Sequence, residues 1–228
     1  MNRILSTLKG HRTLAVAASA LAATAAGAQN YKLQEYNPVE HAVISQTIAP
    51  DARAAGMGDV GAATDPDVNS QYWNPAKYPF CISRAGIALN YTPWLRQLVN
   101  DIDLAYVAGY YRIGDYSAVS GSLRYFSLGE VMTSEDANAM TVKPYEMSID
   151  AAYSLMLSEH FSLAAAIRWI YSDLRYDYSE ESSPASAFAA DVAMYYNNYF
   201  NMGSRECQLG LGLNISNVGS KISYYGDE

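Results

Sequence analysis

Seven segments that follow Phe80 alternate apolar with small or polar side chains at a period of two. Segments of this kind, each about 8 to 13 residues long, are typical of transmembrane β-strands. In the clearest one, the apolar Val119, Leu123 and Tyr125 oppose a face that carries Arg124, so we expect this arginine to point inside. No apolar run of about 18 residues occurs after residue 28, which excludes helical spans and leaves a closed barrel as the only way for this part to cross a membrane.

Charge falls on the small-residue face of these segments, as Asp150, Arg168 and Asp191 show. This is the inverse of a soluble barrel, whose interior is apolar and whose exterior is wet. A soluble β-sandwich, whose core would cover the apolar faces, is the alternative. The segment 104–111 has two similar faces, so the pattern leaves its orientation open.

The connections between segments alternate in length, as in membrane barrels with long external loops and short periplasmic turns. Residues 93–101, 129–144 and 172–186 form the long connections, and 114–115 and 158–159 the tight ones. The connection 197–205 is longer than this pattern predicts. Single-chain bacterial barrels have even strand counts, and open edges in lipid are costly, so seven strands predict the amino-terminal half of a longer barrel.

The first 28 residues have the features of a secretion signal. Arg3, Lys9 and Arg12 precede the apolar run 13–26, and Ala26-Gly27-Ala28 matches the small-x-small cleavage pattern. We expect the mature chain to begin at Gln29, with 12 Lys and Arg against 23 Asp and Glu, a net charge of −11. Such a surface repels nucleic acid, so no nucleic-acid partner is expected.

The small-residue segment 47–80 lies between the signal and the strands, where a barrel carries an inner plug. Its Gly56, Gly58 and Gly61 spell GMGDVG, which formally satisfies a dinucleotide-binding fingerprint. Pro50 precedes these glycines where a buried strand is needed, so we expect no cofactor; the glycines are better explained by close backbone approach in a crowded lumen.

A second motif in this segment is Asn74-Pro75-Ala76. A residue before proline is held extended, and the short amide of Asn74 can bond the following backbone and start a turn. We expect a structural role for the motif first, with gating of the lumen as a second hypothesis.

Catalytic and metal-binding patterns are missing from the predicted mature sequence. It holds only two histidines, His41 and His160, and nothing supports a nucleophile and base meeting at either, so we expect neither an enzyme nor a metal site. Cys81 and Cys207 make an even count, which permits a disulfide; two isolated thiols are the alternative.

The first long connection carries an unusually apolar cluster. Pro93, Trp94 and Leu95 are followed by Leu98, and exposed apolar residues in a loop on a rigid scaffold favour a partner contact. The alternative is that Trp94 belongs to the aromatic girdle of a membrane barrel.

Four stretches of the chain carry a family resemblance, which runs from about residue 44 to the end: APDARAAGMGDVGAATDPDVNSQYWNPAKY, NYTPWLRQLVNDIDLAYVAGYY, SLRYFSLGE and ISNVGSKISY. They closely resemble the PorV-like outer-membrane proteins of the type IX secretion system of Bacteroidetes, which are similar to the FadL family of fatty-acid transporters, barrels of 14 strands with an inner hatch. The resemblance implies an all-β transmembrane antiparallel barrel. Together with the signal peptide at 1–28, it leads us to expect a hatch at 29–80 and the amino-terminal half-barrel at 81–228.

The resemblance also implies a function. Members of this family bind the carboxy-terminal signal domain of exported cargo proteins and shuttle the cargo from the translocon to the sortase complex at the cell surface. The implied partners are therefore cargo, translocon and sortase proteins and outer-membrane lipid, without catalysis or cofactor. A transporter of hydrophobic small molecules, like the FadL relatives, and a structural barrel without ligand remain alternatives.

Overall fold

The fold was determined as a computed structural model, which describes residues 43–94, 101–132, 141–174, 183–222 and 224. Residues 42–228 form one compact unit, and the description below concerns this unit. The predicted signal peptide, His41, Leu95 and Leu98 lie outside the described residues. None of the helices in the described ranges combines the length and the hydropathy of a membrane span.

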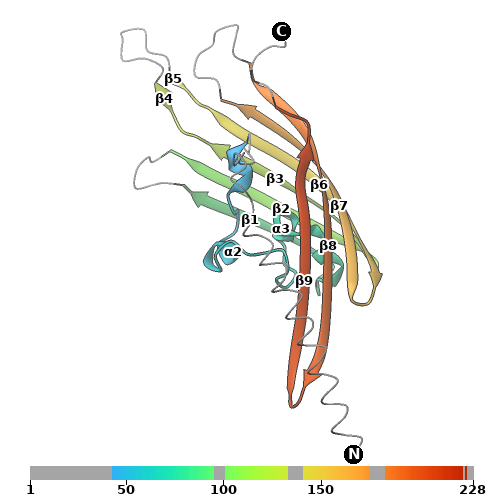
Figure 1. Cartoon of the computed structure of the whole chain (residues 1–228). Coiled ribbons are helices and arrows are strands. Elements are labelled where there is room, and N and C mark those ends of the chain that lie inside the picture. The colour runs from blue at the N-terminus through green and yellow to red at the C-terminus, as the bar shows by residue number, and fades with distance from the viewer. Residues whose placement is uncertain (1–42, 95–100, 133–140, 175–182, 223, 225–228) are drawn as a thin grey trace, which may run out of the picture. The chain divides into compact units, whose positions relative to one another are not determined.

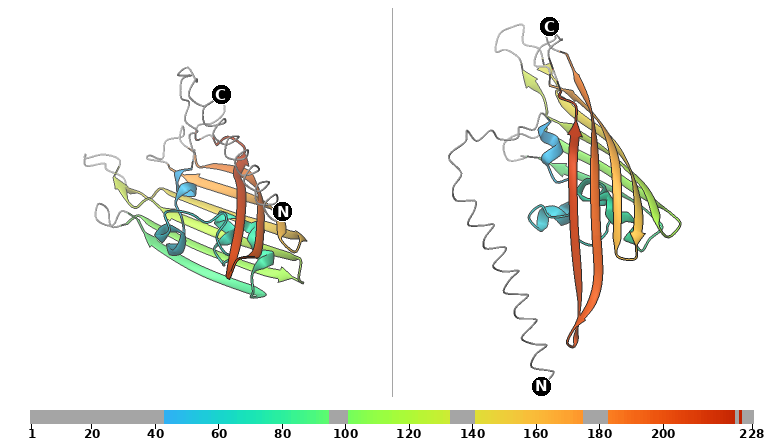
Figure 2. Two further views of the ribbon diagram at one scale, coloured as in Figure 1. Left: turned by 60° about the horizontal axis from the view of Figure 1, so that its bottom comes forward. Right: turned by 45° about the vertical axis from the view of Figure 1, so that its right-hand side comes forward.

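Seven antiparallel strands form one sheet in which every strand pairs with its neighbours along the chain. The sheet curves into half of a barrel (Figures 1 and 2), which confirms the predicted fold class and strand number. The strands are β1 (Ala85–Pro93), β2 (Asp103–Ile113), β3 (Ser117–Ser127), β6 (Tyr145–Ser158), β7 (Phe161–Asp173), β8 (Ala185–Met202) and β9 (Arg205–Gly219). A short ribbon of β4 (Val131–Met132) and β5 (Thr141–Val142), which the sequence did not predict, lies in the connection after β3.

The two faces of the sheet follow the predicted alternation. Large apolar side chains on the convex face stay exposed among the described residues, with exposed fractions of 80% for Ile87, 71% for Ile167 and 70% for Phe188. A sandwich would cover this face with a second sheet, so that alternative is wrong for the described residues. Arg124 is buried on the inner face, as predicted, and β2 turns Leu104 and its alternate neighbours inward.

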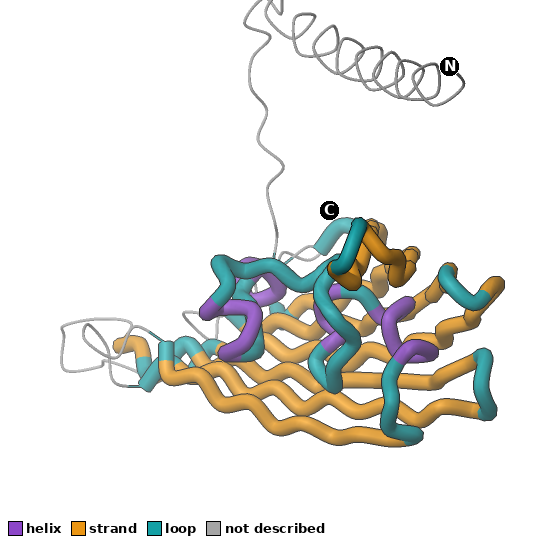
Figure 3. Tube along the Cα trace, turned by 90° about the horizontal axis from the view of Figure 1, so that it is seen from below, coloured by secondary structure: helices purple, strands orange, loops and turns teal. Residues whose placement is uncertain are grey.

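Residues 43–80, called here the hatch segment, pack on the concave face of the sheet (Figure 3). The segment contains four short helices: η2 (Ile44–Thr47), α2 (Ala52–Gly56), α3 (Ser70–Trp73) and η3 (Pro75–Phe80). The carboxylate of Asp51 caps α2 by accepting a hydrogen bond of 2.8 Å from the amide of Ala54. Ala76 and Tyr78 of η3 are fully buried against the strands, so the hatch segment forms the core together with the sheet.

The long loop expected at 197–205 is not present. The strands β8 and β9 continue to Met202 and Arg205, and Gly203, at φ 67°, makes a tight turn between them. The prediction failed because the side chains from Tyr199 onward are exposed on both faces of the hairpin, so this stretch has no apolar alternation to mark it as a strand.

Both cysteines are free thiols, so the disulfide alternative is wrong. Cys81 is buried in a cluster with Tyr78 and Tyr110, whereas Cys207 lies opposite Phe200 on the β8–β9 hairpin.

Candidate functional site

The contact between the hatch segment and the inner wall is the candidate site, and Arg124 of β3 lies at its centre. Both terminal nitrogens of the guanidinium donate to the carbonyl oxygen of Ile48 at 3.0 Å, and one of them also donates to the carbonyl oxygen of Ser45. The guanidinium lies 4.9 Å from the ring centroid of Tyr72 and 5.6 Å from that of Tyr106. Backbone carbonyls and aromatic faces therefore take the place of a carboxylate around this buried charge.

Glu146 of β6 binds the same helix of the hatch segment, η2, through a backbone amide rather than a carbonyl group. Its carboxylate accepts hydrogen bonds from the amide of Ser45 at 3.1 Å and from the hydroxyl of Ser172 at 3.4 Å. Together, Arg124 and Glu146 bind the carbonyl and the amide of Ser45, so η2 is fixed in one position on the wall.

A buried ionic cluster lies further along the inner wall. Arg168 of β7 contacts Asp191 at 2.9 Å and Asp150 at 3.4 Å. Asp150 also accepts hydrogen bonds from Ser122 at 2.8 Å and from the side-chain amide of Gln71 in the hatch segment. The paired charges and hydrogen bonds compensate the cost of burial, and Gln71 couples the cluster to α3.

The side-chain amide of Asn74 both accepts and donates hydrogen bonds. Its Oδ1 accepts from the amide of Ala76 at 3.0 Å, which is the turn expected from the sequence. Its Nδ2 donates at 2.9 Å to the carbonyl oxygens of Ala62 and Met194. This fully buried residue thus joins two parts of the hatch segment to strand β8.

The residues after Asn74 bind the wall through their backbones. The carbonyl oxygen of Pro75 accepts from the hydroxyl of Ser154 at 2.7 Å, and that of Ala76 accepts from the hydroxyl of Ser162. Small hydroxyl residues on β6 and β7 therefore let η3 approach the wall closely.

The three glycines of GMGDVG have different environments. A Cβ on Gly61 would lie 2.2 Å from the ring of Trp73, so a side chain at this position requires the ring to move. Gly58 has φ 79°, a conformation that favours glycine, whereas a Cβ on Gly56 would meet open space. The motif lies at the end of α2 and in the turn after it, and no strand precedes it between residue 43 and α2.

Lys77 is a buried cation that the sequence reasoning missed. Its ammonium group donates to the carbonyl oxygen of Gly61 at 2.7 Å and to the hydroxyl of Thr64 at 3.2 Å. Burial lowers the pKa of Lys77 to about 8. Its place directly after Asn74-Pro75-Ala76, in a segment expected to lie inside the barrel, was the available signal.

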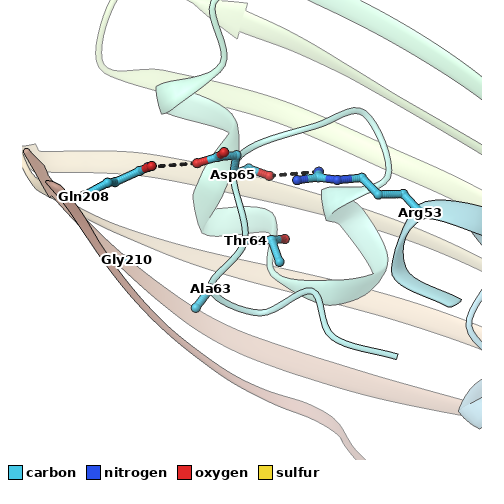
Figure 4. Close-up of a pocket in the computed structure, with 6 residues that line it drawn as sticks. All are labelled: Arg53, Ala63, Thr64, Asp65, Gln208 and Gly210. Atoms are coloured by element: carbon cyan, nitrogen blue, oxygen red, sulfur yellow. Dashed lines mark hydrogen bonds between the residues drawn. The ribbon is translucent and has the colours of Figure 1, made fainter. Parts of the chain in front are cut away.

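A cavity of about 290 Å³ lies between the hatch segment and β9 (Figure 4). Its lining is mainly polar and is formed by Arg53, Ala63, Thr64, Asp65, Gln208 and Gly210. Arg53 donates to the carbonyl oxygen of Asp65 at 3.3 Å, and Gln208 donates to the Asp65 carboxylate at 2.8 Å.

The predicted contact loop is described only at its base. Pro93 is the last residue of β1, and the amide of Trp94 donates to the carbonyl oxygen of Ile102 at 2.9 Å. The Trp94 side chain is 36% exposed. Trp94 follows the last residue of β1, whereas Asn74 of the hatch motif bonds to β8, so the two candidate sets lie at different strands.

Comparison with known proteins assigns the chain to a family. The family model described as "Type IX secretion system protein PorV" matches residues 31–228. A search of curated proteins gave no match. Because the family model covers most of the sequence, this chain belongs to the PorV family of type IX secretion system proteins.

Proposed function

We propose that this PorV-family protein lies in the outer membrane and receives exported cargo there. It binds the carboxy-terminal signal domain of the cargo and carries it from the translocon to the sortase complex. The convex apolar face and the family's role in secretion support this placement. We assign no catalytic role to the chain.

The observation that carries the proposal is the contact between the hatch segment and the inner wall. Arg124, Glu146, Asp150 and Asn74 bind the segment at several points along the sheet. The concave face is thus occupied by the chain itself, and recognition of a large partner falls to the rim. There the connection after β1 begins with Pro93 and Trp94 and continues through Leu95 and Leu98.

Transport of hydrophobic molecules is less well supported by the described residues. A fatty acid needs an apolar pocket, and binding pockets for such ligands are mostly lined by hydrophobic side chains. The cavity behind the hatch segment instead exposes Arg53, Asp65 and Gln208. The inner wall also carries the buried charged cluster of Asp150, Arg168 and Asp191.

Affinity purification of the tagged full-length protein from outer membranes tests this function. We expect recovery of exported proteins that share a carboxy-terminal signal domain. Trp94→Asp should reduce this recovery without reducing barrel assembly, whereas Trp94→Phe, which retains the aromatic ring, should not. Bound fatty acid without protein partners would refute the carrier function, and unchanged recovery with Trp94→Asp would return Trp94 to the lipid girdle.

A further inference from the structure

The β8–β9 hairpin extends beyond the rest of the sheet. β7 pairs with β8 only as far as Tyr196, whereas β9 stays paired with β8 as far as Met202. Residues 197–202 and 205–210 therefore form a two-stranded ribbon that projects past the neighbouring turns (Figures 1 and 2). At about 3.3 Å per residue, the ribbon is roughly 20 Å long.

The ribbon lies outside the hydrocarbon layer, if the protein has the outer-membrane placement of the proposed function. On β6, apolar residues face outward from Tyr145 to Leu157, which is about 40 Å along the strand. A strand tilted by about 40° spans roughly 30 Å of membrane over this length, and an apolar band is about 25 Å tall. The ribbon continues from the end with the tight turns, which is the periplasmic end of membrane barrels.

One edge of the ribbon presents free backbone groups. The amide of Asn197 donates to the carbonyl oxygen of His160 at 2.8 Å, so this amide points away from β9. Alternate residues of a strand direct their backbone groups to the same side, so the backbone N–H and C=O groups of Tyr199 and Asn201 also point away from β9. No strand of the described part of the chain pairs with β8 there, because β7 has already ended.

This edge lacks the features that normally protect an exposed strand. Proteins block free edges with lysine, proline, bulges or inward charges. The stretch Asn-Asn-Tyr-Phe-Asn-Met at 197–202 contains no charge and no proline, and its register with β9 is regular. Phe200 is 41% exposed and Met202 66%, and both lie on the outward face. An unprotected edge with apolar side chains beside it is suited to pairing with another strand.

We propose that this edge of β8 docks an extended segment of a periplasmic partner protein by strand addition. The N–H and C=O groups of Tyr199 and Asn201 form the new ladder. Alternate apolar side chains of the added strand contact Phe200 and Met202, and the absence of charge on 197–202 selects an uncharged segment. The surface lies at the opposite end of the sheet from Trp94, so it is a second docking site, distinct from the proposed cargo site.

Paired variants of Asn201 test the proposal in the full-length protein. Asn201→Pro removes the free amide and blocks the edge, but it leaves the β8–β9 ladder intact because this amide points away from β9. Asn201→Ala keeps the amide and is the matched control. We expect the proline variant to lose a periplasmic partner from complexes purified from outer membranes, and the alanine variant to retain it.

Hydrogen exchange of the ribbon amides identifies the mode of docking. We expect the amides of Tyr199 and Asn201 to exchange slowly in the purified complex and fast in the same protein alone in phospholipid nanodiscs. Equal exchange in both samples would overturn the proposal. Protection in nanodiscs alone would assign the surface to lipid, and protection that rises with protein concentration would assign it to a second copy; either result also overturns it. Recovery of cargo is scored separately, so loss of the proposed function is distinguishable from loss of this site.

Discussion

Arg124 and Ile48 are joined by two hydrogen bonds of 3.0 Å, from both terminal guanidinium nitrogens to one carbonyl oxygen. Strand β3 thereby holds a residue 76 positions earlier in the chain, at the start of the hatch segment. The described ion pairs of the inner wall do not include Arg124, so its charge is compensated by the hatch segment and by two tyrosine rings. Hatch and wall therefore stabilise each other.

Arg124→Met should loosen η2 from the wall, because the carbonyl groups of Ser45 and Ile48 lose their donor inside a buried site. Hydrogen bonds to charged groups contribute about 1.5 to 3 kcal/mol each, but the variant also no longer buries a charge, so we expect a net loss of roughly 3 kcal/mol. Limited proteolysis of the full-length protein should show faster cleavage near Ser45. Arg124→Lys, which keeps the charge, should have a smaller effect, and equal cleavage of Arg124→Met and parent would contradict this role.

Asn74→Ala should destabilise the protein more than Asn69→Ala does. The first change removes a fully buried side chain and leaves three backbone partners without Asn74, and each buried group left unsatisfied costs about 1 to 3 kcal/mol. Among the described residues, the Asn69 side chain accepts a single hydrogen bond, from Asn90 at 2.7 Å, so its loss should cost about 1 kcal/mol. Denaturant unfolding in detergent measures both changes, and similar midpoints for the two variants would be inconsistent with the role given to Asn74.

Gly61→Ala should displace Trp73, since the new Cβ overlaps the indole ring. Overpacking of this kind costs about 1 to 3 kcal/mol. Gly56→Ala is the control, because its Cβ meets open space in a helix, where alanine is favoured. The fluorescence of Trp73, isolated by replacing every other tryptophan, Trp94 and Trp169 among them, with phenylalanine, should change for Gly61→Ala alone. An unchanged spectrum would disprove the tight contact.

Lys77 should make the stability of the folded protein depend on pH above about pH 8. Its pKa is about 8 in the folded protein and 10.5 ordinarily, so the unfolded chain binds more protons between these values. The cost of burying the charge is fully present below about pH 8 and disappears as the pH approaches 10.5, so stability rises through this window.

Comparison with Lys77→Met isolates the contribution of Lys77 to the pH dependence of stability, because all other titrating groups are common to both proteins. Between pH 8 and 10.5, the free energy of unfolding of the parent should rise by roughly 3 kcal/mol relative to that of the variant. Unfolding free energies at three pH values across this window provide the measurement. A constant difference would mean that Lys77 titrates near its ordinary pKa.

The strands and their faces could be predicted from the sequence because alternation directly reports which side is apolar. Arg124 is an example, since its neighbours Leu123 and Tyr125 face outward as expected. The hairpin tip could not be predicted, because Tyr199, Phe200 and Met202 are exposed and the backbone alone maintains their pairing.

The buried ionic cluster of Asp150, Arg168 and Asp191 depends on strand registers that the sequence does not reveal. Counting back from the turn that pairs Ser158 with Phe161 would put Asp150 opposite Trp169. A register shift between Met156 and Ser158 instead places Asp150 opposite Arg168, where the two form an ion pair. Alternation predicts that Asp150 and Arg168 share the inner face, but the bulge decides which inner residue of β7 lies opposite Asp150.

The central claim is that cargo binds at the external rim while the hatch segment occupies the inner wall. Photocrosslinking with p-benzoylphenylalanine tests it most directly, with the probe at Trp94 on the rim or at Ala63 beside the inner cavity. We predict that the cargo signal domain is captured from position 94 and not from position 63. Capture from position 63 alone would contradict the account, because it would require cargo to enter behind the hatch segment.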